Sequence, residues 1–126
     1  MGPEEPQLPA LTDPIPYELL GSGTIVFHRT GPYPGKYAGC YVIDVDNRKT
    51  RGFDFGLAVG FCVSPDGNKI AFTKYSSYVS VYDVYVINTD GSQLTRLDNF
   101  QGQDRFPSWS PDGDRLFFWV DGYPAT

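Results

Sequence analysis

Histidine and cysteine, which commonly form metal centres and catalytic dyads, are scarce in this chain. Its 126 residues include one histidine, His28, and two cysteines, Cys40 and Cys62. Two cysteines are too few for a disulfide framework. Both lie inside apolar strand patterns, which favours buried free thiols, although a bridge between them in an oxidising compartment stays open. The fold must therefore be stabilised mainly by its apolar core.

Clustered positive charge and long apolar runs are also missing. The formal net charge is −5 and the ten lysines and arginines are spread thinly, whereas phosphate binding requires a concentrated basic surface. No apolar run reaches the roughly 18 residues that span a membrane. The first residues, Met1–Pro6, are neither basic nor apolar, so we predict no signal peptide in them, although removal of an earlier signal is compatible with this. We expect no nucleic-acid partner and no membrane span.

Helical periodicity is absent from residue 24 onward, where short apolar runs alternate with turn residues. With 16% aromatic residues, 14 glycines and 11 prolines, this pattern favours many short strands joined by tight turns. Residues 1–20 carry five prolines, which favours an extended arm. The expected strands lie at about residues 24–29, 39–45, 49–54, 59–64, 69–75, 82–88, 94–98, 106–110 and 115–120.

A repeat with a period of about 45 residues organises these strands. The turn Ser-Pro-Asp-Gly occurs at Ser64–Gly67 and again 46 residues later at Ser110–Gly113, and each copy opens an apolar strand. Periods of this size are typical of propellers and solenoids. The other recurring markers are Gly67–Phe72 with Gly113–Phe118, a weaker copy at Gly23–Phe27, Tyr41–Asp44 with Tyr85–Asn88, and Thr50–Arg51 with Thr95–Arg96.

Each period contains four expected strands, which is the content of a β-propeller blade. In Ile70–Phe72 and Leu116–Phe118 both alternating faces are apolar, which indicates strands covered on both sides. The sequence therefore predicts an all-β fold. We expect a partial β-propeller of about two four-stranded antiparallel blades plus part of a third, over residues 21–126, after an N-terminal arm over residues 1–20.

This number of strands is too small to close a ring, because propellers have at least about four blades. Three arrangements remain open: a piece of a longer chain, several copies that complete a ring, or an open stack whose ends the arm covers. Unpaired strand edges and exposed apolar blade faces favour association. Self-association as a homo-oligomer is therefore our hypothesis.

The repeated turn has a structural explanation. Proline fixes φ, aspartate accepts hydrogen bonds from backbone amides, and glycine adopts the positive φ that closes the hairpin. A pair of carboxylates for acid–base work is less favoured, because Asp66 and Asp112 occupy the same repeated position. The residues predicted to be structural are Ser64, Pro65, Asp66, Gly67, Ser110, Pro111, Asp112 and Gly113.

The segment Phe106–Phe118 resembles the WD40-like Pro-Asp (PD40) repeat of TolB-type propellers almost position by position. Phe61–Phe72 is a second match, with Val63 where the repeat usually has tryptophan, and Gly21–Gly23 replaces the turn in a third. The resemblance covers about residues 21–120. It implies a non-catalytic module for protein–protein interaction in the periplasm or another extracytoplasmic compartment. The gating propeller of a prolyl-oligopeptidase-like hydrolase and a carbohydrate-binding propeller are the alternatives, because fold alone does not fix function.

Binding residues are expected at the end of the sheets opposite the Ser-Pro-Asp-Gly turns. Successive turns of an up-and-down blade alternate between the two ends, and the loops at this end are longer and differ between copies. They hold tyrosines and charged residues typical of contact surfaces, although tyrosines that fill gaps between blades explain the same pattern. The residues predicted to bind are Tyr33, Lys36, Tyr37, Tyr75, Tyr78, Gln103, Asp104 and Arg105, with Tyr82 as a further candidate.

Catalysis and metal binding have little support in the sequence. No serine lies in a Gly-x-Ser-x-Gly setting, and a lone His28 on an expected strand is better explained as a structural or surface residue. Asp44–Asn47 resembles part of a calcium loop but lacks its spacing, central glycine and terminal glutamate. We predict no catalytic residue, no metal site and no cofactor.

Overall fold

The computed structural model describes residues 7–8, 15–29, 39–76, 81–97 and 103–121. This part of the chain contains ten strands and one short 3-10 helix, η1, at Tyr17–Leu19. The strands are β1 (Gln7–Leu8), β2 (Thr24–Arg29), β3 (Gly39–Asp44), β4 (Lys49–Phe53), β5 (Ala58–Val63), β6 (Lys69–Ser76), β7 (Val81–Asn88), β8 (Thr95–Arg96), β9 (Gln103–Trp109) and β10 (Leu116–Asp121).

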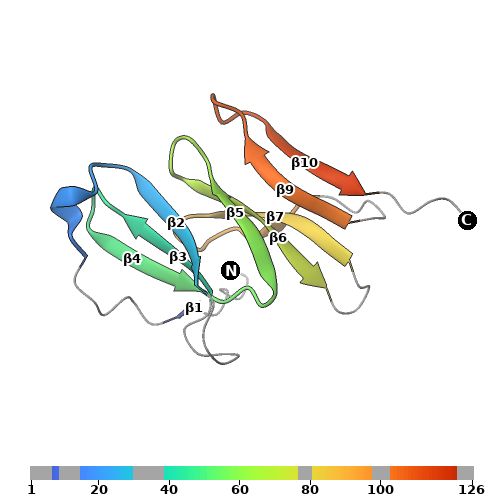
Figure 1. Cartoon of the computed structure of the whole chain (residues 1–126), viewed down its shortest axis with the longest axis horizontal. Coiled ribbons are helices and arrows are strands. Elements are labelled where there is room, and N and C mark those ends of the chain that lie inside the picture. The colour runs from blue at the N-terminus through green and yellow to red at the C-terminus, as the bar shows by residue number, and fades with distance from the viewer. Residues whose placement is uncertain (1–6, 9–14, 30–38, 77–80, 98–102, 122–126) are drawn as a thin grey trace, which may run out of the picture.

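The strands form three antiparallel sheets that follow one another along the long axis of the molecule (Figure 1). Blade 1 has the strand order β1-β4-β3-β2, blade 2 has the order β5-β6-β7-β8, and blade 3 is the hairpin of β9 and β10. The architecture is all-β and is a partial β-propeller. Each of the nine expected strands is present within a few residues of its expected bounds.

The repeat shows which position each strand occupies in its blade. β2, β3 and β4 correspond to β6, β7 and β8, because their sequences recur with the period of the turns. β5 is the innermost strand of blade 2 and corresponds to β9, whereas no described strand takes this place beside β2. β1 lies on the opposite edge of blade 1, where Gln7 pairs with Phe53 and Leu8 with Gly52. Part of the proline-rich segment thus extends blade 1 at its outer edge.

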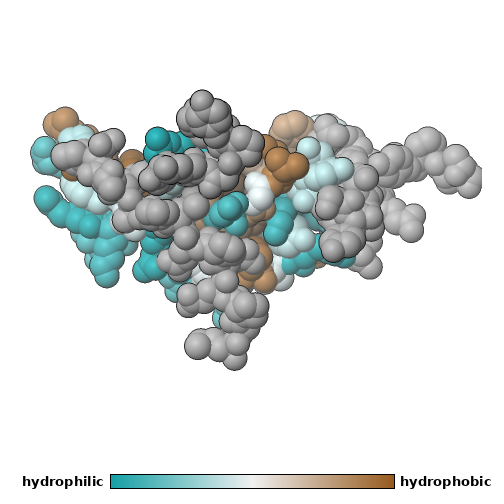
Figure 2. Space-filling view, turned by 90° about the horizontal axis from the view of Figure 1, so that it is seen from below, coloured by the Kyte–Doolittle hydropathy of each residue, from teal (hydrophilic) through white to brown (hydrophobic). Residues whose placement is uncertain are grey.

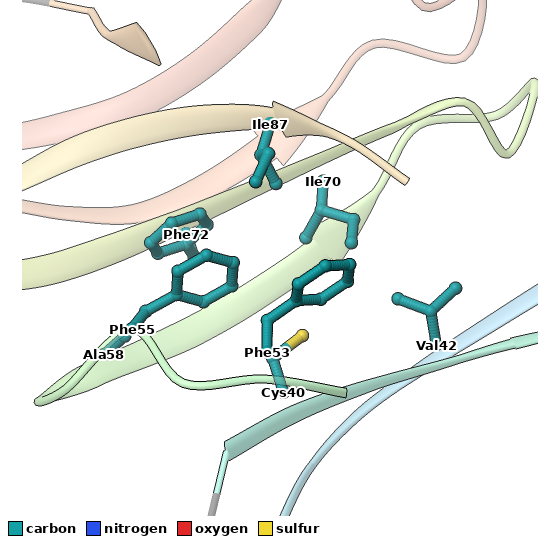
Figure 3. Close-up of a cluster of buried hydrophobic side chains, with 8 residues drawn as sticks. All are labelled: Cys40, Val42, Phe53, Phe55, Ala58, Ile70, Phe72 and Ile87. Atoms are coloured by element: carbon teal, nitrogen blue, oxygen red, sulfur yellow. The ribbon is translucent and has the colours of Figure 1, made fainter. Parts of the chain in front are cut away.

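Blades 1 and 2 pack through an aromatic and aliphatic core (Figure 3). The rings of Phe55 and Phe72 stack with their centroids 4.4 Å apart, and such pairs stabilise a core beyond their buried area. Sequence alternation explains the arrangement, because successive strand residues point to opposite faces. The buried members of this core are Cys40, Val42, Phe53, Phe55, Ala58, Ile70, Phe72 and Ile87.

Blade 3 buries one face and leaves the other open. In β6, Ile70–Phe72 are each 0% exposed, so the prediction that this strand is covered on both sides is confirmed. In β10, however, Phe117 is 59% exposed and Trp119 is 69% exposed. The same prediction is therefore wrong for Leu116–Phe118, because no described element packs on the outer face of blade 3.

The two Ser-Pro-Asp-Gly turns have the same hydrogen bonds. In the first turn, the Ser64 hydroxyl donates to Asp66 Oδ1 (2.6 Å) and accepts from the Lys69 amide (3.0 Å). The Gly67 amide donates to the Ser64 carbonyl at 2.9 Å. The second turn repeats these bonds at the same distances, through Ser110, Asp112, Arg115 and Gly113. Each turn therefore satisfies its own buried serine hydroxyl, as buried polar groups require.

The glycine of each turn lies against the preceding blade. Gly67 has a φ of +77°, and a Cβ added to it would stand 2.6 Å from Thr24 Oγ1 of blade 1. The Thr24 hydroxyl also donates to the Gly67 carbonyl at 3.3 Å. Gly113 has a φ of +78° but more room, because its added Cβ would meet Pro65 Cδ at 3.6 Å. Glycine is thus required by conformation at both turns and by close approach only at Gly67.

Trp109 connects blade 3 to the innermost strand of blade 2. Its indole Nε1 donates to the carbonyl oxygen of Cys62 in β5 at 3.0 Å. Val63 occupies the same repeat position in blade 2 and cannot donate such a bond. Blade 1 has no described strand in the innermost position that could accept such a bond from this place in the repeat.

Candidate binding site

The end of the blades opposite the Ser-Pro-Asp-Gly turns carries the candidate site. Gln103–Arg105 are the first residues of β9 at this end, and Tyr75 lies near the end of β6. Figure 2 views the molecule from below Figure 1, the side where β5 and β9 begin, and shows hydrophobic residues gathered in a band in the middle. The predicted binding residues outside the described part are Tyr33, Lys36, Tyr37 and Tyr78.

Tyr75 and Tyr82 form a cross-strand pair near the tip of the β6–β7 hairpin. Their ring centroids are 5.0 Å apart and the rings are tilted by 51°. Both side chains are half-buried, which is the usual state of a tyrosine with an apolar body and a polar tip. Tyr82 also lines a cavity, so the structure brings one of the tyrosines of this end to a possible site.

The cavity has a volume of about 300 Å³ and lies between blades 2 and 3. It is lined by Val59, Gly60, Thr73, Tyr82 and Phe106. Val59 is 51% exposed and Phe106 is 68% exposed, so aliphatic and aromatic surface meets solvent at the cavity. A concave, largely apolar site with few polar groups has the form of a ligand pocket.

A bulge shared by β5 and β9 shapes the cavity. In both strands the register against the next strand shifts at the same place in the repeat. Gly60 and Phe106 occupy this place, with φ of +70° and +59°. Glycine adopts this conformation at little cost, whereas a bulky residue in the left-handed region lowers the stability of the fold by about 1–2 kcal/mol. Gly60 inside a strand pattern is a sequence signal for a bulge. Phe106 gives no such signal in the sequence, although the strand register places it at the position equivalent to Gly60.

Thr73 belongs to the lining of the cavity, but its hydroxyl oxygen is buried beneath the wall. Its side chain is 2% exposed, and its Oγ1 has no hydrogen-bond partner among the described residues. A buried hydroxyl without a partner costs about 1–3 kcal/mol. The bulge passes directly over this atom, because a Cβ on Gly60 would lie 3.8 Å from Thr73 Oγ1. Threonine is an ordinary strand residue, so the sequence contains no signal that the hydroxyl of Thr73 would be buried without a partner.

A second cavity, of about 240 Å³, lies at the opposite end between blades 1 and 2 and is polar. Its carboxylates are held in turns: the Asn47 side chain donates to Asp44 and the Ser92 hydroxyl to Asp90, and each bond lowers the pKa of its aspartate. Among the described residues, no group of three His, Cys, Asp or Glu side chains could hold a metal ion. These carboxylates are therefore explained by the turns.

The remaining chemically distinctive residues are dispersed. His28 is exposed and its ring lies 5.5 Å from that of Phe61. Cys40 and Cys62 are free thiols, and burial raises the pKa of Cys40 to about 12. None of the helices that the structure describes has the length and apolar character needed to cross a membrane.

Comparisons with known proteins point to a propeller. No family model matches the chain, and no curated protein matches it. A solved structure from Agrobacterium tumefaciens, assigned as TolB, resembles the chain with a TM-score of 0.52 and 30% sequence identity over 64% of this chain. The chain spans 29% of the length of that protein. The chain is thus an all-β partial propeller whose fold is similar to that of a TolB.

Proposed function

We propose that this chain is a non-catalytic propeller-repeat module that binds a protein partner at the end opposite the Ser-Pro-Asp-Gly turns. Phe106 carries the proposal. Glycine, as at Gly60, suits the left-handed position in the bulge, whereas Phe106 adds conformational cost and exposes its ring. Exposed aromatic side chains beside a cavity are typical of the centre of a protein interface.

The predicted loop residues belong to the same proposed surface. Tyr75 and Gln103–Arg105 lie at this end, next to elements that line the cavity. The likeness to a TolB supports a protein partner and a periplasmic or other extracytoplasmic location. Tyr33, Lys36, Tyr37 and Tyr78 are included on the sequence pattern alone.

The substitution Phe106→Gly tests the proposal because it should raise the stability of the fold while it removes the contact of the Phe106 ring with the partner. Peptides selected from a random displayed library on the wild-type chain provide the probes. We expect calorimetry to show at least about a tenfold weaker Kd for Phe106→Gly, the loss typical of a hot-spot residue. The midpoint of urea unfolding should rise at the same time, because left-handed strain is relieved.

Leu19→Ser is the matched control, because Leu19 is 79% exposed but lies in η1 on blade 1. It should change the peptide affinity by less than about twofold, as substitutions outside a hot spot do. Equal losses in both variants would contradict the proposal. Selective binding of glycans on an array, with no selected peptide, would favour the carbohydrate-binding alternative.

We also propose that the outer face of β10 is covered by a blade of a second copy. Ala71 and Thr73 of β6, a strand that packs against β9 of blade 3, are buried, whereas their equivalents Phe117 and Trp119 are mostly exposed. Burying such side chains contributes about 1.5–3 kcal/mol each. Light scattering at micromolar concentration should give a mass above that of one copy, and Trp119→Ser should lower it. A wild-type mass of one copy would contradict self-association.

A further inference from the structure

We propose that the free edge of β2 takes up an extended segment of another protein, which adds to blade 1 as its innermost strand. This edge is a second surface, separate from the cavity at Phe106. Three observations support it: unpaired backbone groups along β2, a cavity beside the start of β2, and a smaller residue, Val63, at the position where blade 3 has Trp109.

β2 presents unpaired backbone groups along one edge. The Val45 amide donates to the Gly23 carbonyl at 2.9 Å, so the Gly23 carbonyl points toward β3. Backbone groups alternate in direction along an antiparallel strand, and those of Thr24, Val26 and His28 therefore point to the opposite edge. None of the strands that the structure describes pairs with this edge. It is the edge of blade 1 on the side of β5 (Figure 1).

The same edge is filled in the other two blades. Val26 corresponds to Ala71 of β6, because β2 and β6 pair with their third strands in the same register, and to Phe117 of β10. Ala71 pairs with Cys62 of β5. Phe117 pairs in the same way with Ser108 of β9. Both innermost strands are thus already paired, so a second copy has no described innermost strand left for this place. A segment of another protein can supply one through main-chain hydrogen bonds.

A cavity of about 460 Å³ beside the start of β2 indicates which side chain the segment presents. Thr24, Val63 and Trp109 belong to its lining. Between blades 2 and 3, Trp109 donates to the carbonyl oxygen of the smaller residue Cys62 at 3.0 Å. Between blades 1 and 2 the equivalent of Trp109 is Val63, which leaves room for a larger side chain opposite it. Val26 packs on the core between these blades, so a residue paired with Val26 faces blade 2. A large apolar side chain at that position of the segment therefore fits.

A peptide that copies residues 103–111 with the change Ser108→Trp is the probe, because it carries an innermost strand of this repeat. NMR titration of the full chain gives its affinity and the amide hydrogen exchange together. We expect the peptide to slow exchange at Val26 and His28, whereas the Phe27 amide, which points toward β3, should be protected already. The unchanged copy should bind about tenfold more weakly, because its serine buries less apolar surface.

Backbone N-methylation of the probe separates strand pairing from side-chain contact. In the chain, the Ser110 amide donates to the Arg115 carbonyl, so the amide of residue 108 points to the paired strand and that of residue 109 points away. N-methylation at position 108 should weaken binding about threefold to tenfold, the equivalent of one hydrogen bond. The same change at position 109 is the control and should weaken binding by less than about twofold.

Substitutions in the chain test the same edge from the other side. His28→Pro removes a donor that points away from β3, and proline is tolerated on such an edge. It should weaken the probe about threefold to tenfold, whereas the matched control His28→Ala keeps the amide and should change the affinity by less than about twofold. Val63→Trp should abolish the preference for the tryptophan probe. Phe106→Gly should bind the probe as the wild type does, because Phe106 lines the other cavity.

The inference would be overturned by the absence of probe binding at millimolar concentration, by binding without slower exchange at Val26 and His28, or by equal losses from the two N-methylations. Slow exchange at these amides in the chain alone, lost on dilution, would assign the edge to a second copy and overturn the assignment to another protein. Selected peptides that bind Phe106→Gly and the wild type equally would contradict the proposed function and leave this inference standing.

Discussion

Alanine substitution at the two equivalent turn glycines separates backbone strain from blade packing. Gly67 and Gly113 have nearly equal φ values, +77° and +78°, so each Gly→Ala change carries the same left-handed cost of about 1–2 kcal/mol. At Gly113 the new methyl makes an ordinary contact of 3.6 Å with Pro65. At Gly67 it would stand 2.6 Å from Thr24 Oγ1, which forces the Thr24 side chain or its strand to shift, and overpacking of this kind costs about 1–3 kcal/mol more.

A second substitution tests whether Thr24 is the cause of the difference. Thr24→Ala alone should cost about 1 kcal/mol, because it removes the hydrogen bond to the Gly67 carbonyl. Combined with Gly67→Ala it also removes the hydroxyl oxygen that makes the closest contact, and only the tight 3.3 Å contact with Cβ of residue 24 remains. The loss of stability in the double variant should therefore be smaller than the sum of the two single losses by about 1–2 kcal/mol. A coupling of this size is within the range seen for residues in contact.

Urea unfolding followed by far-UV circular dichroism gives these free energies, and thermal midpoints give a second scale on which 1 kcal/mol is roughly 3–6 °C. Gly67→Ala should be less stable than Gly113→Ala by about 1–3 kcal/mol. Equal destabilisation by the two changes, or additive effects of Thr24→Ala and Gly67→Ala, would refute the reasoning that the first turn is packed against blade 1.

Three further predictions concern titration, thiol reactivity and the bond between blades. Hydrogen bonds from serine hydroxyls hold the pKa of Asp66 and Asp112 below the unfolded value, so the stability they contribute is present above about pH 4 and lost as pH falls through the folded-state pKa. The urea concentration at the unfolding midpoint should therefore decrease when the pH is lowered below about 4. A midpoint that does not change with pH would contradict this. Cys40, buried with a pKa of about 12, should react with iodoacetamide at about pH 8 only in urea; mass spectrometry of the native protein showing labelled Cys40 would refute it. Trp109→Val should lower the free energy of unfolding by about 2–4 kcal/mol through lost packing and the lost bond to β5. Val63→Trp should not raise the stability. Equal and opposite shifts of the urea midpoint in the two variants would contradict this.

The strands and their order were predictable because each follows from a local signal. Alternating apolar residues bounded by turn residues mark the strands, and the two Ser-Pro-Asp-Gly turns set the period that groups them into blades. The pairing of Gln7–Leu8 with β4 was not predictable, because two residues in a proline-rich segment have no periodicity. The exposure of Phe117 was missed because an apolar residue in sequence does not show which neighbour covers it.

The candidate site was predictable as an end of the molecule but not as a cavity. Alternation of turns places Tyr75 and the start of β9 at the same end. The burial of the Thr73 hydroxyl and the exposure of Phe106 depend on packing between blades and on the φ value at one bulge. Neither quantity follows from residue type, since threonine and phenylalanine are both common in strands.

Calorimetric titration of the selected peptides into the wild-type chain and into Phe106→Gly tests the central claim most directly. If the partner binds at the end opposite the Ser-Pro-Asp-Gly turns, the Kd should weaken at least about tenfold in Phe106→Gly and change by less than about twofold in Leu19→Ser. Equal affinity of the peptides for the wild-type chain and for Phe106→Gly would contradict the claim.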